Sequence, residues 1–252
     1  MRIGAPTKEH IPALKKLWQE AFGDSESAID TFFEAAFCTD RCVLATDNGQ
    51  VLGALYWLEC EYRERPVAYL YAIATAKAHR GKGVCHSIME YTNKRLRELG
   101  YIGAVLVPGS KELFSFYEAM GYSTFSTVSE PKLNASQRSI ELRKINATEY
   151  AEIRRELLPK NSVIQEKENL RYIEKEAELY TGNGFLLACY REKSILYGME
   201  LLGDASLAGD ILFTLGCKEG SFRTVGEGRP FAMYLPLDRG YPSPEYFGLA
   251  FD

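Results

Sequence analysis

Ile73-Ala74-Thr75-Ala76-Lys77-Ala78-His79-Arg80-Gly81-Lys82-Gly83-Val84-Cys85 is followed by an amphipathic run that ends at Leu99. This order predicts an apolar strand, a loop with two glycines, and a helix that begins directly after the loop. Glycine lets the backbone approach a ligand closely, and the first turn of a helix offers unpaired N–H donors at its positive end. The stretch therefore predicts a cradle for phosphate, although a glycine turn ahead of a surface helix would give the same pattern.

A second motif, Phe116-Tyr117-Glu118-Ala119-Met120-Gly121-Tyr122, predicts a helix whose tyrosine lies just before a glycine stop. Together the two motifs resemble the GNAT superfamily of acetyl-CoA-dependent N-acetyltransferases. Arg80, Gly83 and Cys85 match its coenzyme loop, Arg/Gln-x-x-Gly-x-Gly/Ala, and the second motif matches its Phe-Tyr-x-x-x-Gly-Phe/Tyr ending. Cys85 stands where glycine or alanine is usual, but its side chain is small enough to keep the backbone near a pyrophosphate.

The resemblance covers roughly residues 1–125 and implies that acetyl-CoA is the co-substrate. It implies that Ile73 and Thr75 pair with the pantetheine arm through backbone groups, and that the Ile73 N–H polarises the thioester carbonyl. It also implies that backbone amides hold the pyrophosphate along one loop, which consists of Arg80, Gly81, Lys82, Gly83, Val84 and Cys85.

Tyr117 is the candidate general acid. A phenol has a pKa of about 10, so it is protonated at neutral pH and can protonate a departing thiolate. Phe114, Phe116 and Met120 share its helical spacing, so packing in the core is the alternative role.

Glu59 and Glu61 are candidates for the general base, because they share one face of a predicted strand over residues 51–62. Solvated glutamates at a strand end are the alternative. Tyr69 and Tyr71 also share a strand face, and either wall the substrate cleft or pack in the core. The cysteines, Cys85 included, are interpreted as small apolar fillers, not nucleophiles.

The composition predicts a globular protein without a metal site. The 252 residues are 46% apolar and 25% charged, and the net charge of -4 gives no basic surface for nucleic acid. The six cysteines form no C-x-x-C pair, and there are only three histidines. Neither a signal peptide nor an apolar run of membrane-spanning length is present, which predicts a cytoplasmic protein with reduced thiols. The oligomeric state stays open.

The pattern of the first half predicts an α/β unit. A helix is expected from Ile11 to a stop at Gly23, and another through residues 29–37. Asn48-Gly49 predicts a hairpin between the strands 42–45 and 51–62. The remaining elements expected are a strand over 67–74, the long helix to Leu99, a strand over 103–107 and a helix over 111–120.

The second half starts again after a polar linker over residues 127–139. A strand is expected over 140–145, followed by helices that begin near Asn146 and Ser162, the second reaching about Tyr180. A hairpin over 185–202, a helix over 207–215 and a strand over 231–235 complete the pattern. The order of elements echoes the first half, but no Arg-x-x-Gly-x-Gly loop recurs.

The sequence therefore predicts an α/β (α+β) GNAT fold, with a mixed, mostly antiparallel sheet flanked by helices. Residues 1–127 would form the acetyltransferase domain, and 138–252 a degenerate GNAT-like domain that shapes the substrate cleft. An unrelated α+β cap is the alternative for the second half. The apolar segment Tyr246–Asp252 is expected to be docked, either as a last strand or, as in the enhanced-intracellular-survival type of acetyltransferase that the tandem layout resembles, with its carboxylate in the active site.

The function predicted is direct transfer of an acetyl group from acetyl-CoA to a primary amine of a small molecule or a peptide. The alternative is a non-catalytic acyl-CoA-binding or regulatory module. Neither nucleic acid nor membrane is expected as a partner.

Overall fold

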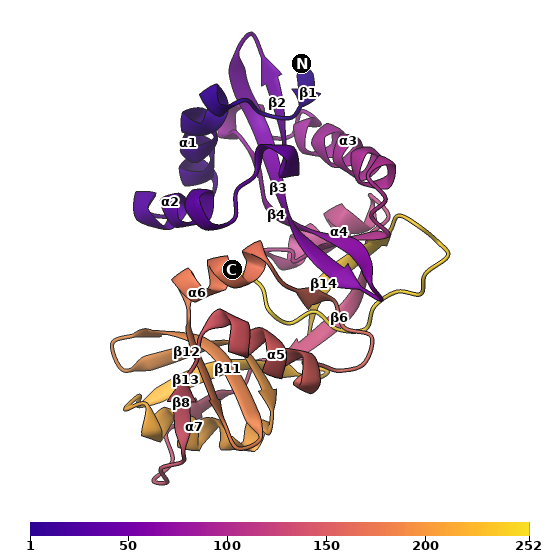
Figure 1. Cartoon of the computed structure of the whole chain (residues 1–252). Helices are drawn as coiled ribbons and strands as arrows, with labels where there is room; N and C mark the ends of the chain where they lie inside the picture. The colour runs from indigo at the N-terminus through magenta and orange to yellow at the C-terminus, as the bar shows by residue number, and fades with distance from the viewer. Residues whose placement is uncertain (252) are drawn as a thin grey trace.

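The computed structural model describes residues 1–251, which form two α/β halves that lie one above the other in Figure 1. The N-terminal half carries four α-helices around its strands. Its elements are β1 (Arg2–Gly4), η1 (Lys8–His10), α1 (Ile11–Phe22), α2 (Glu26–Ala35), η2 (Thr39–Arg41), β2 (Cys42–Asp47), β3 (Gln50–Tyr62), β4 (Arg65–Thr75), η3 (Lys77–His79), α3 (Val84–Glu98), β5 (Gly103–Leu106), α4 (Lys111–Glu118), β6 (Ser123–Ser129) and β7 (Lys132–Asn134).

The C-terminal half repeats the order of the first. Two helices precede three antiparallel strands, and a short helix then leads to a strand parallel to the third. Its elements are β8 (Leu142–Lys144), α5 (Ala147–Leu157), β9 (Ile164–Gln165), α6 (Glu168–Glu176), β10 (Glu178–Gly182), β11 (Phe185–Glu192), β12 (Ile195–Gly203), η4 (Ala205–Leu207), α7 (Ala208–Thr214), β13 (Glu219–Val225) and β14 (Arg229–Pro236).

Local chemistry explains several of the boundaries. Gly23 ends α1 in the left-handed conformation, and the Ser25 hydroxyl caps α2 by accepting a hydrogen bond from the Ala28 amide. Asn48 and Gly49 both have positive φ, as a tight hairpin turn between β2 and β3 requires. These local signals confirm the elements expected at the start of the chain.

One sheet joins the two halves. Its strand order is β1-β2-β3-β4-β5-β14-β6-β13-β12-β11-β10-β8, so β14, from the C-terminal half, lies between β5 and β6 of the N-terminal half. Gly103 on β5 permits this insertion, because a Cβ there would lie about 2.1 Å from the Tyr234 hydroxyl on β14. The N-terminal sheet is therefore completed by the end of the chain.

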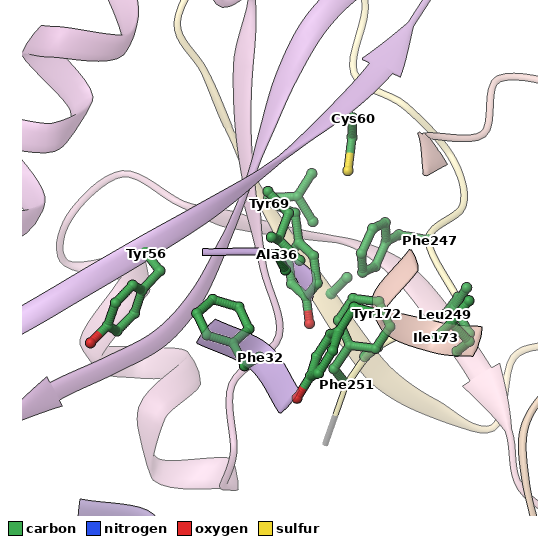
Figure 2. Packing of buried hydrophobic residues seen from close by; sticks show 14 of the residues in the cluster. Phe32, Ala36, Tyr56, Cys60, Tyr69, Tyr172, Ile173, Phe247, Leu249 and Phe251 are labelled. Atoms are coloured by element: carbon green, nitrogen blue, oxygen red, sulfur yellow. The ribbon is translucent and has the colours of Figure 1, made fainter. Parts of the chain in front are cut away.

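The hydrophobic core is also shared. In Figure 2, Tyr69 from β4 lies with Tyr172 from α6 and with Phe247 and Phe251, which follow β14. The ring centroids of Tyr69 and Phe247 are 4.9 Å apart, and those of Tyr172 and Phe251 are 4.8 Å apart. The predicted division into 1–127 and 138–252 thus falls in a molecule whose sheet and core continue across it.

The C-terminal segment is docked, as expected. Tyr246–Phe251 is buried, and its backbone forms only one isolated bridge, between Tyr246 and Ser162, instead of a last strand. Asp252, whose carboxylate would lie in the active site under one of the two alternatives for this segment, lies outside the described residues.

The prediction of a helix from Ser162 to Tyr180 is wrong at both ends. The Ser162 hydroxyl donates to the Pro159 carbonyl instead of capping a helix, and Ile164–Gln165 pairs with β3. Helix α6 starts only at Glu168, and β10 begins at Glu178. The expected polar linker likewise contains the end of β6 and all of β7. In both segments, pairing with distant strands overrides the local pattern.

Among the described residues, no helix is long and apolar enough to cross a bilayer.

Candidate active site

The main cavity lies where β4 and β5 separate. The two strands run parallel and pair only from Val67–Gly103 to Tyr69–Val105, whereas β4 continues to Thr75. Beyond that point a cavity of about 1220 Å³ is lined by residues 69–73 of β4, by Leu106 at the end of β5 and by residues 107–111 after it. Its walls come from both halves, and the C-terminal half contributes Tyr172, Glu176, Tyr190, Glu192, Met199, Arg229, Pro230 and Phe251.

A bulge in β4 accompanies the separation. The register against β3 shifts between the pairs Ala54–Ala74 and Tyr56–Tyr71, and Ala72 has a φ of 47°. A bulge bends its strand and increases the local twist. The bent end of β4 leaves the backbone of residues 70–75 without a strand on the β5 side, where an extended ligand could pair with it.

Tyr117 lines this cavity from the last turn of α4. Its side chain is 6% exposed, and within residues 1–251 its hydroxyl has no hydrogen-bond partner. Burial and the neighbouring Cys85 raise the pKa of Tyr117 well above its usual value, so the phenol stays protonated. A buried, protonated and unpartnered hydroxyl at a cavity wall can donate a proton to a bound group.

The predicted coenzyme loop adopts the form that the sequence indicates. Gly81 and Gly83 have φ of 72° and 78°, and Gly83 immediately precedes α3. No side chain caps the helix, and no acidic residue lies in its first turn. The first amides of α3 are therefore free to bind an anion, which the exposed Arg80 and Lys82 would also attract.

The structure brings part of the predicted site together. Ile73 lines the cavity, and Ile73 and Cys85 pack against the hydrophobic cluster that contains Tyr117 and Val84. Thr75, Arg80 and the loop up to Cys85 lie outside the cavity wall, at the end of β4 and the start of α3. The side chains of Arg80 and Lys82 donate hydrogen bonds to the carbonyls of Thr75 and Ala78, at 3.2 and 2.8 Å.

Glu59 and Glu61 are not brought to Tyr117. Neither lines the cavity, and Glu59 forms ion pairs with Lys167 and with Arg41, the latter at 3.8 Å. Their assignment as general base remains a prediction, and the geometry gives it no support.

Four carboxylates that line the cavity were missed in the sequence: Asp24, Glu118, Glu176 and Glu192, of which Asp24 and Glu176 interact with each other. Asp24 lies between α1 and α2, and Glu176 ends α6, so they come from different halves. Trp18 Nε1 donates a hydrogen bond of 2.7 Å to Asp24 Oδ2. No spacing pattern links residues so far apart, because only the packing of α6 against α2 and β3 brings them to one cavity.

Residues 1–251 contain no group of three or more histidine, cysteine, aspartate or glutamate side chains placed to hold a metal ion.

Comparison with known proteins supports the N-terminal assignment. Residues 2–125 match the family model described as acetyltransferase (GNAT) domain. No curated protein sequence matches the chain.

Solved structures resemble the whole chain, at low sequence identity. A GCN5-related N-acetyltransferase from Anabaena variabilis has a TM-score of 0.75 at 12% identity, covering 94% of this chain and 73% of its own. Eis1 from Mycobacterium abscessus has a TM-score of 0.69 at 13% identity, with coverages of 94% and 74%. A putative acetyltransferase from Pyrococcus horikoshii has a TM-score of 0.64 at 15% identity, with coverages of 98% and 93%.

At these identities the structures show a shared fold, and that fold extends over both halves of the chain. The family model adds a domain assignment, which the fold alone does not give. Residues 2–125 are a GNAT acetyltransferase domain, set in an α/β molecule whose mixed sheet is flanked by helices as in its structural neighbours.

Proposed function

We propose that this protein transfers an acetyl group from acetyl-CoA directly to an amine. The observation that carries the proposal is the cavity between the separated ends of β4 and β5, which Tyr117 and Ile73 line. Both residues pack in the same hydrophobic cluster as Val84 and Cys85, which begin the uncapped helix α3. The loop has the donors that a pyrophosphate needs, and no acidic side chain in the first turn of α3 opposes an anion.

In the proposed reaction the neutral amine attacks the thioester carbonyl, so a C–N bond forms and the C–S bond breaks. The Ile73 backbone N–H polarises the carbonyl oxygen. Tyr117 donates its proton to the departing thiolate, and the proton that the amine loses passes to water or to a carboxylate base. Mixing the protein with acetyl-CoA and a panel of amines, and following release of the free thiol, tests this function. Coenzyme binding without thiol release for any amine would favour the non-catalytic module.

The role of the loop backbone leads to a prediction for Gly83. Its φ of 78° is unfavourable for a side chain, so Gly83→Val should distort the amides at the start of α3. We expect the Kd for acetyl-CoA to rise about tenfold or more, since left-handed strain costs about 1–3 kcal/mol. Lys82→Ala should have a much smaller effect, because its ammonium already binds the Ala78 carbonyl in solvent. Calorimetry with acetyl-CoA measures both.

Gly100→Val is the matched control for strain. Gly100 has a φ of 82° and open space where a Cβ would lie, but it follows α3 at its other end. Equal losses of affinity for the Gly83 and Gly100 variants, or equally small losses for Gly83→Val and Lys82→Ala, would place the coenzyme elsewhere.

The C-terminal half is proposed to be a GNAT-like copy that shapes the cleft and binds no coenzyme. The segment that corresponds to the loop follows β12, where the Asp204 carboxylate accepts hydrogen bonds from the Ser206 amide at 3.0 Å and from its hydroxyl at 2.6 Å. A carboxylate there repels a phosphate and uses a donor that the phosphate would need.

Calorimetric titration should therefore give one acetyl-CoA per chain. Asp204→Ala removes the local carboxylate and should leave that stoichiometry unchanged, because the short α7 helix offers no long dipole behind it. Two sites per chain in the unmodified protein would contradict the assignment of the second half.

A further inference from the structure

The cavity has an acidic end that the coenzyme does not need. Asp24 and Glu176 define this acidic end, and each comes from a different half of the molecule. The Trp18 indole holds the Asp24 carboxylate through its 2.7 Å hydrogen bond. Glu176 is half-buried at the end of α6.

The two carboxylates of the acidic end form no ion pair within residues 1–251, although Lys111 and Arg229 line other parts of the same cavity wall. Neither Asp24 nor Glu176 has a partner among the ion pairs of the described residues, and Arg229, which also lines the cavity, is held by Glu130 at 2.8 Å. Burial, and then the charge of Asp24, raise the pKa of Glu176 above its usual value. Two carboxylates that repel each other in a cavity favour a bound cation.

Aromatic rings surround the same region. The ring centroids of Trp18 and Tyr71 are 5.5 Å apart. Those of Tyr172 and Phe251, which Figure 2 shows side by side, are 4.8 Å apart. The hydroxyls of Tyr71 and Tyr172 are 3.5 Å apart. Aromatic faces attract ammonium groups and repel anions. The aromatic walls and the two carboxylates therefore both favour a cationic ligand.

An independent feature points to where the acceptor reacts. Tyr117 lines the same cavity, its side chain is 6% exposed, and its hydroxyl forms no hydrogen bond within residues 1–251. The nitrogen that attacks the thioester must be neutral, because an ammonium has no lone pair. An ammonium held by carboxylates therefore cannot be the attacking group, and it must be a second group on the acceptor.

We propose that Asp24 and Glu176 bind a second, cationic ammonium group of the acceptor, so that the substrates are amines with at least two amino groups. This inference rests on the proposed acetyl transfer. Asp24 and Glu176 act as specificity-determining residues that hold one end of the acceptor, and its other, neutral amino group reaches the thioester near Ile73 and Tyr117.

The test compares straight-chain α,ω-diamines with amino alcohols of the same chain length, which carry a hydroxyl in place of the second amine. The unmodified protein should use a diamine with a kcat/KM about tenfold or more above that of its matched amino alcohol, since a carboxylate holds an ammonium group more strongly than a neutral hydroxyl. Asp24→Asn and Glu176→Gln should each lower this ratio severalfold through KM for the diamine. The KM for acetyl-CoA should not change.

Glu34→Gln is the matched control, because Glu34 is an exposed carboxylate of α2 away from the cavity wall. It should keep the preference of the unmodified protein. Equal use of diamines and amino alcohols by the unmodified protein, or an unchanged preference in both cavity variants, would overturn the proposal while leaving acetyl transfer intact. Absence of thiol release with every acceptor would contradict acetyl transfer itself, and calorimetry of a diamine with the unmodified and variant proteins then still decides whether the acidic end binds cations.

Thermal unfolding separates recognition from a structural role. The raised pKa means that the folded state disfavours ionised Glu176, so this group stabilises the fold at low pH and loses that contribution as the pH rises through the raised value. Glu176→Gln should thus unfold at the same or a higher temperature at pH 7 while its KM for diamines increases. A clear fall in the unfolding temperature at pH 7 would assign Glu176 to the fold instead.

Discussion

Tyr117→Phe is expected to lower kcat by about 10²–10⁴-fold, the usual contribution of a general acid, without changing the affinity for acetyl-CoA. The substitution keeps the ring, which packs against Phe116 and Tyr122, and removes only the hydroxyl. That hydroxyl has no hydrogen-bond partner within residues 1–251, so its loss leaves no buried group unsatisfied and should not destabilise the fold. Thiol release under saturating substrates, together with calorimetry of acetyl-CoA, measures the two effects.

Tyr91→Phe is the control, because Tyr91 is an exposed tyrosine of α3 that does not line the cavity. It should retain full activity. If Tyr117→Phe also retained full activity at neutral pH, the role of Tyr117 would be limited to packing in the core. This is the alternative that its helical spacing with Phe114 and Met120 left open.

The raised pKa of Tyr117 gives this prediction a pH dependence. Burial disfavours the phenolate, so the acid stays protonated well above pH 10. The kcat of the unmodified protein should therefore show no alkaline decline from loss of this proton below pH 10. A decline near pH 9 that disappears in Tyr117→Phe would indicate a tyrosine exposed to solvent during turnover.

The parts of the site that the sequence predicts well are local. The strand, the glycine loop and the helix are contiguous from Ile73 to Leu99, and their φ values and helix start follow from residues within a few positions of each other. The turns at Gly23 and Asn48-Gly49 could also be predicted, because glycine and asparagine adopt a positive φ more readily than other residues.

The parts that could not be predicted depend on contacts between the halves. Nothing in the sequence around β14 indicates that it inserts between β5 and β6, because strand pairing of this kind is set by the whole sheet. The same applies to Gln165, which looks like part of a helix but is buried and donates to the Leu249 carbonyl at 2.8 Å. Asp24 and Glu176 were missed for this reason too.

A buried ion pair in the C-terminal half fixes the segment that closes the cavity. Arg154 on α5 and Glu200 on β12 are each 1% exposed, and Arg154 Nε donates to Glu200 Oε2 at 2.6 Å and Nη2 to Oε1 at 3.0 Å. The hydroxyls of Tyr150 and Tyr246 both donate to the same carboxylate at 3.2 Å. Tyr246 begins the docked segment that places Phe251 in the cavity wall.

Glu200→Gln is therefore expected to lower the free energy of unfolding by about 3–5 kcal/mol, because it leaves the Arg154 guanidinium buried without a counter-charge. The matched control is Glu178→Gln, which breaks the partly exposed ion pairs of Glu178 with Arg191 and Lys144 and should cost at most about 1 kcal/mol. Urea unfolding followed by circular dichroism measures both. The double variant Arg154→Met with Glu200→Leu should recover much of the loss, since removing both charges removes the desolvation cost.

The same substitution should affect the acceptor more than the coenzyme. Loosening Tyr246 frees the segment that carries Phe251, whereas the α3 loop lies in the other half and keeps its own contacts. At a temperature where Glu200→Gln is still folded, its KM for amines should rise while its Kd for acetyl-CoA stays near that of the unmodified protein. If Glu200→Gln costs no more than Glu178→Gln, or if its amine and coenzyme affinities fall together, the buried pair does not hold the acceptor side of the cavity in place.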